Sequence, residues 1–124
     1  MTIRIIESKI SLEELRTLCQ KTFKYFVKFV ADIDQGLIAI GGELHADGEE
    51  LLLESGSRQD NLWGVNFYSE NDPDDRVEYE SFINIRPRLD NNSMKVENES
   101  IRIRIRQLAE QLILAPGEKV VLPK

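Results

Sequence analysis

The only histidine of the chain, His45, has a carboxylate two residues away on each side, Glu43 and Asp47. In an extended strand, side chains two positions apart share a face, so this spacing would place an imidazole and two carboxylates together. Such a group can exchange protons near neutral pH, coordinate a divalent cation or line a polar pocket. The same three residues are also compatible with a simple junction between a strand and a helix, in which Asp47 is the N-cap.

Two further segments carry polar side chains in the same alternating way. Asn66 alternates with large apolar residues in "LWGVNFYS", and Asn84 and Arg86 alternate with isoleucines in "SFINIRP". If these strands are neighbours with aligned polar faces, five side chains gather in one place: Glu43, His45, Asn66, Asn84 and Arg86. A guanidinium binds a carboxylate or phosphate through two hydrogen bonds, and the asparagines would orient that anion. We therefore predict a non-catalytic binding or interaction module with a polar pocket on the sheet face for a small anionic ligand.

Two other interpretations stay open. The first is a divalent-metal-dependent hydrolase that uses Glu43, His45 and Asp47 as ligands or general base. Zinc usually requires several histidines or cysteines, and the chain has one of each, whereas magnesium or manganese accept carboxylates and water. The second is an ordinary solvated sheet face, which shows the same polar alternation. Whether the protein is an enzyme is thus left open, and no cofactor is predicted.

Composition narrows the class of protein and of partner. With 124 residues, 41% of them hydrophobic and 31% charged, the chain is long enough for one globular domain spanning residues 1–124. The net charge of −6 argues against nucleic acid as a partner, because phosphate binding needs a concentrated basic face. A lone cysteine, no signal-like start and no long apolar run indicate a cytoplasmic protein outside the membrane. A protein partner and a homo-oligomer both remain compatible with the sequence.

The pattern of elements predicts an α+β fold, with a mainly antiparallel sheet of about four or five strands packed on two or three helices that cover one face. "TIRIIE" reads as an opening strand, and Ser11 begins a helix that buries Cys19. The segments "YFVKFVADI" and "GLIAIGGELHA" predict a hairpin that turns at residues 34–36. A short helix is expected from Asp47 to Gly56, then strands in "LWGVNFYS" and "VEYESFINIRP", with Trp63 in the core.

The segment "NESIRIRIRQLAEQLIL" can be read as a strand or a helix, and the choice bears on function. As a strand it would place three arginines on one face, suited to phosphates. As a helix capped by Asn98 it forms one apolar stripe and disperses the arginines. We predict the helix, with its apolar stripe at Ile101, Ile105, Leu108 and Leu112. Residues 115–124 are expected to form a C-terminal tail that either adds a short edge strand or drapes over the core.

The stretches "ISLEEL", "GGELHAD", "LWGVNFY" and "INIRP", in this order, resemble a family of small bacterial proteins known as a domain of unknown function. The resemblance extends from about Ile3 to Leu114. It implies a bacterial, cytoplasmic, single-domain protein, and it brings no activity and no catalytic residues. The chain departs from the family pattern at Gly48, where the resemblance leads us to expect alanine.

Overall fold

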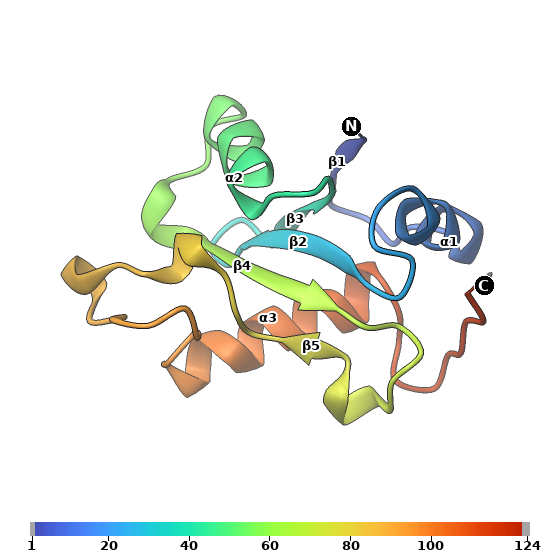
Figure 1. The fold of residues 1–124 in the computed structure, drawn as a ribbon. Helices are drawn as coiled ribbons and strands as arrows, with labels where there is room; N and C mark the ends of the chain where they lie inside the picture. The colour runs from blue at the N-terminus through green and yellow to red at the C-terminus, as the bar shows by residue number, and fades with distance from the viewer. Residues whose placement is uncertain (1, 123–124) are drawn as a thin grey trace.

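The computed structural model describes residues 2–122. Five strands form one antiparallel sheet in the spatial order β1-β3-β2-β4-β5 (Figure 1). The strands are β1 (Ile3–Ile6), β2 (Val27–Asp32), β3 (Leu37–Gly41), β4 (Leu62–Phe67) and β5 (Val77–Glu78). The α-helices are α1 (Leu12–Lys21), α2 (His45–Glu54) and α3 (Glu99–Leu112), and none in residues 2–122 is long and apolar enough to cross a bilayer. The predicted α+β class is confirmed.

The predicted hairpin of β2 and β3 is present, and it lies at the centre of the sheet. Its turn is held by Asp32, a fully buried carboxylate at the end of β2. One oxygen of Asp32 accepts the amide of Gln35 at 2.9 Å, and the other accepts the hydroxyl of Ser57 at 2.6 Å. A buried carboxylate is tolerated here because these donors replace its water. The contact with Ser57 also ties the turn to the chain that follows α2.

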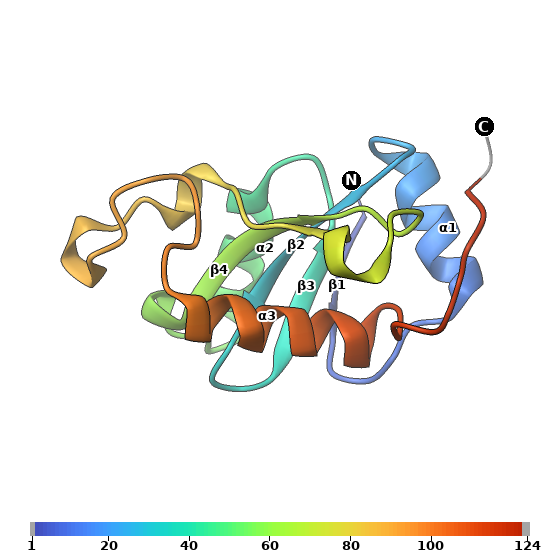
Figure 2. The same cartoon turned by 90° about the horizontal axis from the view of Figure 1, so that it is seen from below.

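The helix α3 covers one face of the sheet (Figure 2). Trp63, Val65 and Phe67 alternate along β4, point to this face and share one buried cluster with Leu108 and Leu112 of α3. Trp63 is only 2% exposed, so its predicted place in the core is confirmed.

The arginines of α3 diverge, as the helical reading of residues 98–114 predicts. Asn98 caps the helix, and its side-chain oxygen accepts the amide of Ile101 at 3.1 Å. The three side chains then reach separate partners: Arg102 the carbonyl of Val96, Arg104 the carbonyl of Ile33, and Arg106 the carboxylate of Asp74. They therefore form no common basic stripe.

The helix α1 lies beside the β1 side of the sheet (Figure 1). The Ser11 hydroxyl accepts the amide of Glu14 at 3.1 Å, so the predicted N-cap is present. Cys19 is fully buried in the main cluster, and burial, with a smaller effect of Glu70, raises the pKa of its thiol to about 11. A thiol in this state is a packing group and a poor nucleophile.

The second helix covers the opposite face of the sheet, so the expectation that helices cover one face is wrong (Figure 1). Leu52 of α2 packs on Val30 and Ala39 in a smaller apolar cluster. Gly48 is what allows the close approach, because a β-carbon at that position would lie 3.1 Å from Val30 Cγ2.

The helix α2 also begins two residues earlier than the predicted N-cap at Asp47. The third strand ends at Gly41, not at Ala46, and the N-cap is Leu44, which supplies no side-chain cap. Gly41 adopts φ +109, which few other residues tolerate, and this turns the chain out of the sheet. His45 is therefore the first residue of a helix rather than a residue on a strand face.

The predicted strand "VEYESFINIRP" ends at Glu78 and gives way to two single-turn 3₁₀ helices, Phe82–Asn84 and Pro87–Leu89. The alternation of isoleucines with polar residues does not indicate a strand here, because the polar Asn84 is buried in the protein interior. Asn84 is fully buried, whereas Ile85 is 43% exposed. The fold of this segment is set by asparagine side chains, since Asn91 donates to the carbonyls of Asn84 and Lys95 at 2.8 and 2.7 Å.

The C-terminal tail contains no strand between residues 115 and 122. Val120 and Leu122 are buried against the main cluster, so this part of the tail drapes over the core. Residues 123 and 124 lie outside the described part of the chain.

Candidate functional site

A hollow that combines an ammonium, an imidazole, an amide and carboxylates lies where the first turn of α2 meets the open part of the sheet. It has a volume of about 330 Å³, at the small end of the range for ligand sites. We call it the α2 pocket, and its principal lining residues are Lys28, His45, Asn66, Glu78, Ser81 and Phe82. Strands supply its floor, α2 supplies one wall, and the segment after β5 supplies the other.

A row of three polar side chains crosses the floor of the α2 pocket. Lys28 of β2, Asn66 of β4 and Glu78 of β5 are direct cross-strand neighbours in the sheet. The Lys28 ammonium donates to Asn66 Oδ1 at 3.4 Å, and Asn66 Nδ2 donates to Glu78 Oε1 at 2.8 Å. The row therefore runs from a cation through a neutral amide to a carboxylate.

Lys28 is half-buried, and its ammonium lies near two stacked aromatic rings. Its Nζ is 5.3 Å from the centroid of Phe23 and 5.9 Å from that of Phe26. Burial lowers the pKa of Lys28, while the carboxylate of Glu78 acts in the opposite direction. An ammonium has three donors and the bond to Asn66 uses one, so Lys28 can bind a further acceptor.

His45 lies over the sheet and is only 7% exposed. Its Nε2 is 2.7 Å from the carbonyl oxygen of Val65, which can only accept, so this nitrogen carries the proton. Gly64 allows the imidazole to lie this close to the strand, because a β-carbon at that position would be 3.0 Å from His45 Cγ and 2.8 Å from Ser81. Burial lowers the pKa of His45 to about 4, against hydrogen bonds to Val65 and Asn66 that raise it. At neutral pH the ring is an uncharged donor.

Apolar side chains border the polar floor. Leu44 and Phe82 line the α2 pocket and are 61% and 78% exposed. The turn that presents Phe82 is capped by Ser81, whose hydroxyl accepts the amide of Ile83 at 3.3 Å. Two large exposed apolar residues beside one hollow offer contact area to the apolar part of a ligand.

Arg86, the predicted anion-binding residue, does not line the α2 pocket. It is 8% exposed, pairs with Glu49 of α2 at 2.9 Å and lies over the ring of Trp63 at 5.1 Å. Burial lowers the pKa of Arg86, and Glu49 opposes this. Its charge is therefore already balanced by Glu49 within the fold.

Asn84 is likewise a structural residue and lines none of the hollows described here. Its side chain accepts the Gly64 amide and donates to the Gly64 carbonyl, both at 2.9 Å. It also donates to the carbonyl of Met94 at 3.0 Å. One amide side chain thus takes the place of a strand at this point of β4, where β5 does not reach.

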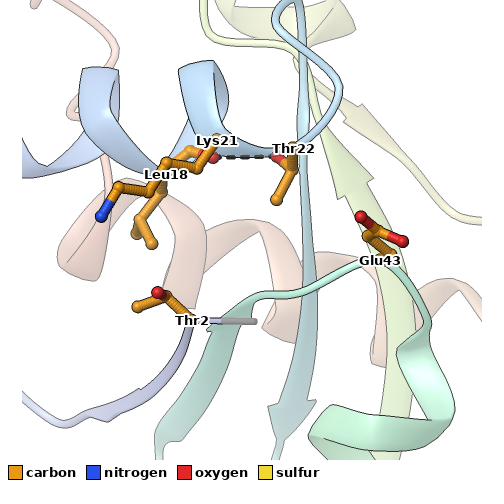
Figure 3. Close-up of a pocket in the computed structure, with 5 residues that line it drawn as sticks. All are labelled: Thr2, Leu18, Lys21, Thr22 and Glu43. Carbon is orange, nitrogen blue, oxygen red and sulfur yellow. Dashed lines mark hydrogen bonds between the residues drawn. The ribbon is translucent and has the colours of Figure 1, made fainter.

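Glu43 lines a separate hollow of about 510 Å³, drawn in Figure 3. Lys21 and Glu43 lie on opposite sides of it, with Thr2, Leu18 and Thr22 between them. Both charged side chains are exposed, and no buried polar side chain faces this hollow. Of the five predicted ligand-binding residues, only His45 and Asn66 meet in one pocket.

The metal alternative required Glu43, His45 and Asp47 to converge. The structure places them in three different hollows, because Asp47 lies in a groove with Ile3 and Glu50 on the other side of α2. Within residues 2–122, no group of three or more histidine, cysteine or acidic side chains could hold a metal ion. This arrangement gives the hydrolase hypothesis no support from geometry.

Sequence reasoning missed Lys28, Glu78, Ser81 and Phe82. The partial signal was the alternation of Lys28 with apolar residues in "YFVKFV", which places it on the same kind of polar face as Asn66. Its pairing with Asn66 depends on β2 lying beside β4, and no local pattern encodes that order.

Comparison with known proteins finds one matching family. The model of that family, which is described as a protein of unknown function, matches residues 4–112. No curated protein and no solved structure matches. Bacterial origin, a cytoplasmic location and self-association stay predictions.

Proposed function

We propose that this chain, which belongs to the family of proteins of unknown function DUF5674, is a binding module whose α2 pocket takes a small anionic ligand with an apolar body. The observation that carries the proposal is a half-buried ammonium, that of Lys28, in the same hollow as the exposed side chains of Leu44 and Phe82. The ligand class predicted from the sequence is retained, with Lys28 in place of Arg86 as the cation.

The charge preference rests on two features of the pocket. A desolvated ammonium gains most from an anionic partner, because the surrounding protein screens their attraction less than water does. The first turn of α2 forms the adjoining wall, and its N-cap Leu44 leaves the terminal amides without a side-chain acceptor. These amides carry partial positive charge and favour a carboxylate or phosphate.

The apolar preference rests on the border of the pocket. Phe82 and Leu44 would both lose water on contact with a hydrocarbon group, at about 25 cal/mol for each Å² of apolar surface covered. Catalysis has no comparable support, since His45 is a neutral donor held by Val65 and the one cysteine is buried.

The test is a titration of ¹⁵N-labelled protein with 3-phenylpropanoate, benzoate and inorganic phosphate, followed by amide chemical shifts. We expect 3-phenylpropanoate to shift the amides of Ala46, Asn66 and Phe82. Lys28→Met should weaken this binding at least about tenfold, the value of one charge-assisted hydrogen bond. The matched control, Lys21→Met, removes the lysine of the other hollow and should leave binding unchanged.

Two results would contradict the proposal. One is the absence of shifts with all three compounds. The other is a set of shifts at Thr2 and Thr22 that Lys21→Met abolishes, which would assign the ligand to the hollow of Figure 3.

A further inference from the structure

The α2 pocket contains carboxylates as well as a cation. Glu78 ends the polar row on the floor, and Glu80 lines the adjoining wall. Glu78 also acts on Tyr68, whose pKa is raised mainly by burial and further by this carboxylate. His45 is neutral at pH 7, so Lys28 is the cation that these two carboxylates face among the lining residues. A ligand carrying only negative charge would satisfy one end of the pocket and be repelled at the other.

The separation of the charges limits the shape of the ligand. Two hydrogen bonds and the width of one amide group separate the Lys28 ammonium from the Glu78 carboxylate, so the two groups lie within about 8–9 Å. In an α-amino acid the ammonium and carboxylate are about 3 Å apart, and a charge-assisted hydrogen bond of about 2.8 Å at each end extends the span to about 8–9 Å. The largest separation that the row allows is therefore about the span that an α-amino acid bridges.

Asn66, in the middle of the row, keeps the two charged groups available for such a ligand. Asn66 holds Lys28 and Glu78 apart, so neither charge neutralises the other by direct contact. Asn66 is 8% exposed, and its amide is oriented by both bonds. The polar groups are therefore fixed before a ligand arrives, which lowers the entropy lost on binding.

We propose, building on the binding function above, that the carboxylate-bearing ligand of the α2 pocket also carries an ammonium and is a free α-amino acid with an apolar side chain. Its carboxylate binds Lys28 beside the first turn of α2, and its ammonium binds Glu78. Its side chain packs on Phe82 and Leu44. No covalent step is involved, and the Asn66 amide lies beneath the ligand.

The test compares three compounds that differ by one group: L-phenylalanine, 3-phenylpropanoate, which lacks the ammonium, and 2-phenylethylamine, which lacks the carboxylate. Dissociation constants come from amide chemical-shift titrations at pH 7. We expect L-phenylalanine to bind about tenfold more tightly than 3-phenylpropanoate. In Glu78→Gln, which keeps an acceptor for Asn66, this preference should disappear. The control Glu7→Gln removes an exposed carboxylate outside the α2 pocket, and the preference should persist in full.

The outcomes separate this inference from the function on which it rests. If 3-phenylpropanoate binds in the α2 pocket as tightly as L-phenylalanine, the amino-acid assignment is wrong and the anion-binding function stands. If Glu78→Gln leaves the preference intact, the ammonium lies elsewhere and the assignment is also wrong. If none of the three compounds shifts Ala46, Asn66 or Phe82, both proposals fail.

Discussion

Replacing Asn84 with alanine should be among the most damaging single changes in the protein, although the residue touches no ligand. The side chain is fully buried and makes three hydrogen bonds, two with Gly64 and one with the Met94 carbonyl. Alanine would leave the buried amide and carbonyl of Gly64 without these partners, whereas the half-buried Met94 carbonyl would still accept the amide of Ser81. It would also loosen the segment that carries Phe82 and the wall of the α2 pocket.

The magnitude follows from the two Gly64 groups. An unsatisfied buried donor or acceptor costs about 1–3 kcal/mol, and a carbonyl that gains a water loses less. The expected loss in the free energy of unfolding is therefore about 2–4 kcal/mol, a large fraction of the 5–15 kcal/mol typical of a domain. Asn84→Asp should be at least as harmful at neutral pH, because a carboxylate would face the Gly64 and Met94 carbonyls.

Urea unfolding at pH 7, followed by the fluorescence of Trp63, measures this loss. The control is Asn92→Ala, an exposed position in the same segment, for which we expect a change within about 0.5 kcal/mol. A loss below about 1 kcal/mol for Asn84→Ala would refute the reasoning, because Gly64 would then be satisfied without this side chain.

Two further predictions concern charge. Between pH 7 and pH 4, wild type should lose about 3 kcal/mol more of its free energy of unfolding than His45→Gln does, as measured by urea unfolding. The reason is that the histidine of the unfolded chain is protonated below about pH 6.5, whereas the folded one is protonated only near pH 4. Equal losses in the two proteins would contradict this. Glu49→Ala should cost about 3 kcal/mol, because it leaves the buried Arg86 unpaired. Asp60→Ala should lower the melting temperature much less, because the pair of Asp60 with Arg88 is exposed and screened by water. Equal thermal shifts for the two variants would show that the burial of the first pair has no effect.

Much of the fold follows from local patterns that tertiary contacts do not override. Ser11 and Asn98 each begin the helix that the sequence predicts, because an N-cap bonds to amides within its own turn. The alternation of Trp63, Val65 and Phe67 gives the core face of β4 for the same reason, since it needs only the period of a strand.

The segment after β5 could not be predicted in this way. Its alternating isoleucines match a strand, yet Asn84 bonds to a strand 20 residues earlier in the chain and goes inside. Ile85 is displaced outward as a consequence, whereas Ile83 packs against the smaller apolar cluster. A pattern of hydrophobicity contains no information on which polar side chain will find a buried partner.

The candidate site was predictable in part. His45 and Asn66 do share a pocket, but the helix begins at His45 and not at Asp47, so Glu43 is carried to another hollow. The sequence predicts Arg86 as an anion-binding residue because a guanidinium pairs well with carboxylates and phosphates. In the structure, Glu49 on α2 already forms an ion pair with it. Lys28 replaces it through strand order, which is a property of the whole sheet.

Gly48, near the start of α2, affects the width of the pocket because it sets how closely the helix approaches the sheet. Alanine at position 48 would favour the helix by about 1 kcal/mol, yet its β-carbon would press on Val30 and require a shift of a few tenths of an ångström. Because the first turn of the same helix walls the pocket, that shift would move Leu44 and His45 relative to the strands. A relative with alanine here would have a wider opening and would admit a bulkier ligand. The stability of the helix and the width of the pocket therefore depend on the same atom.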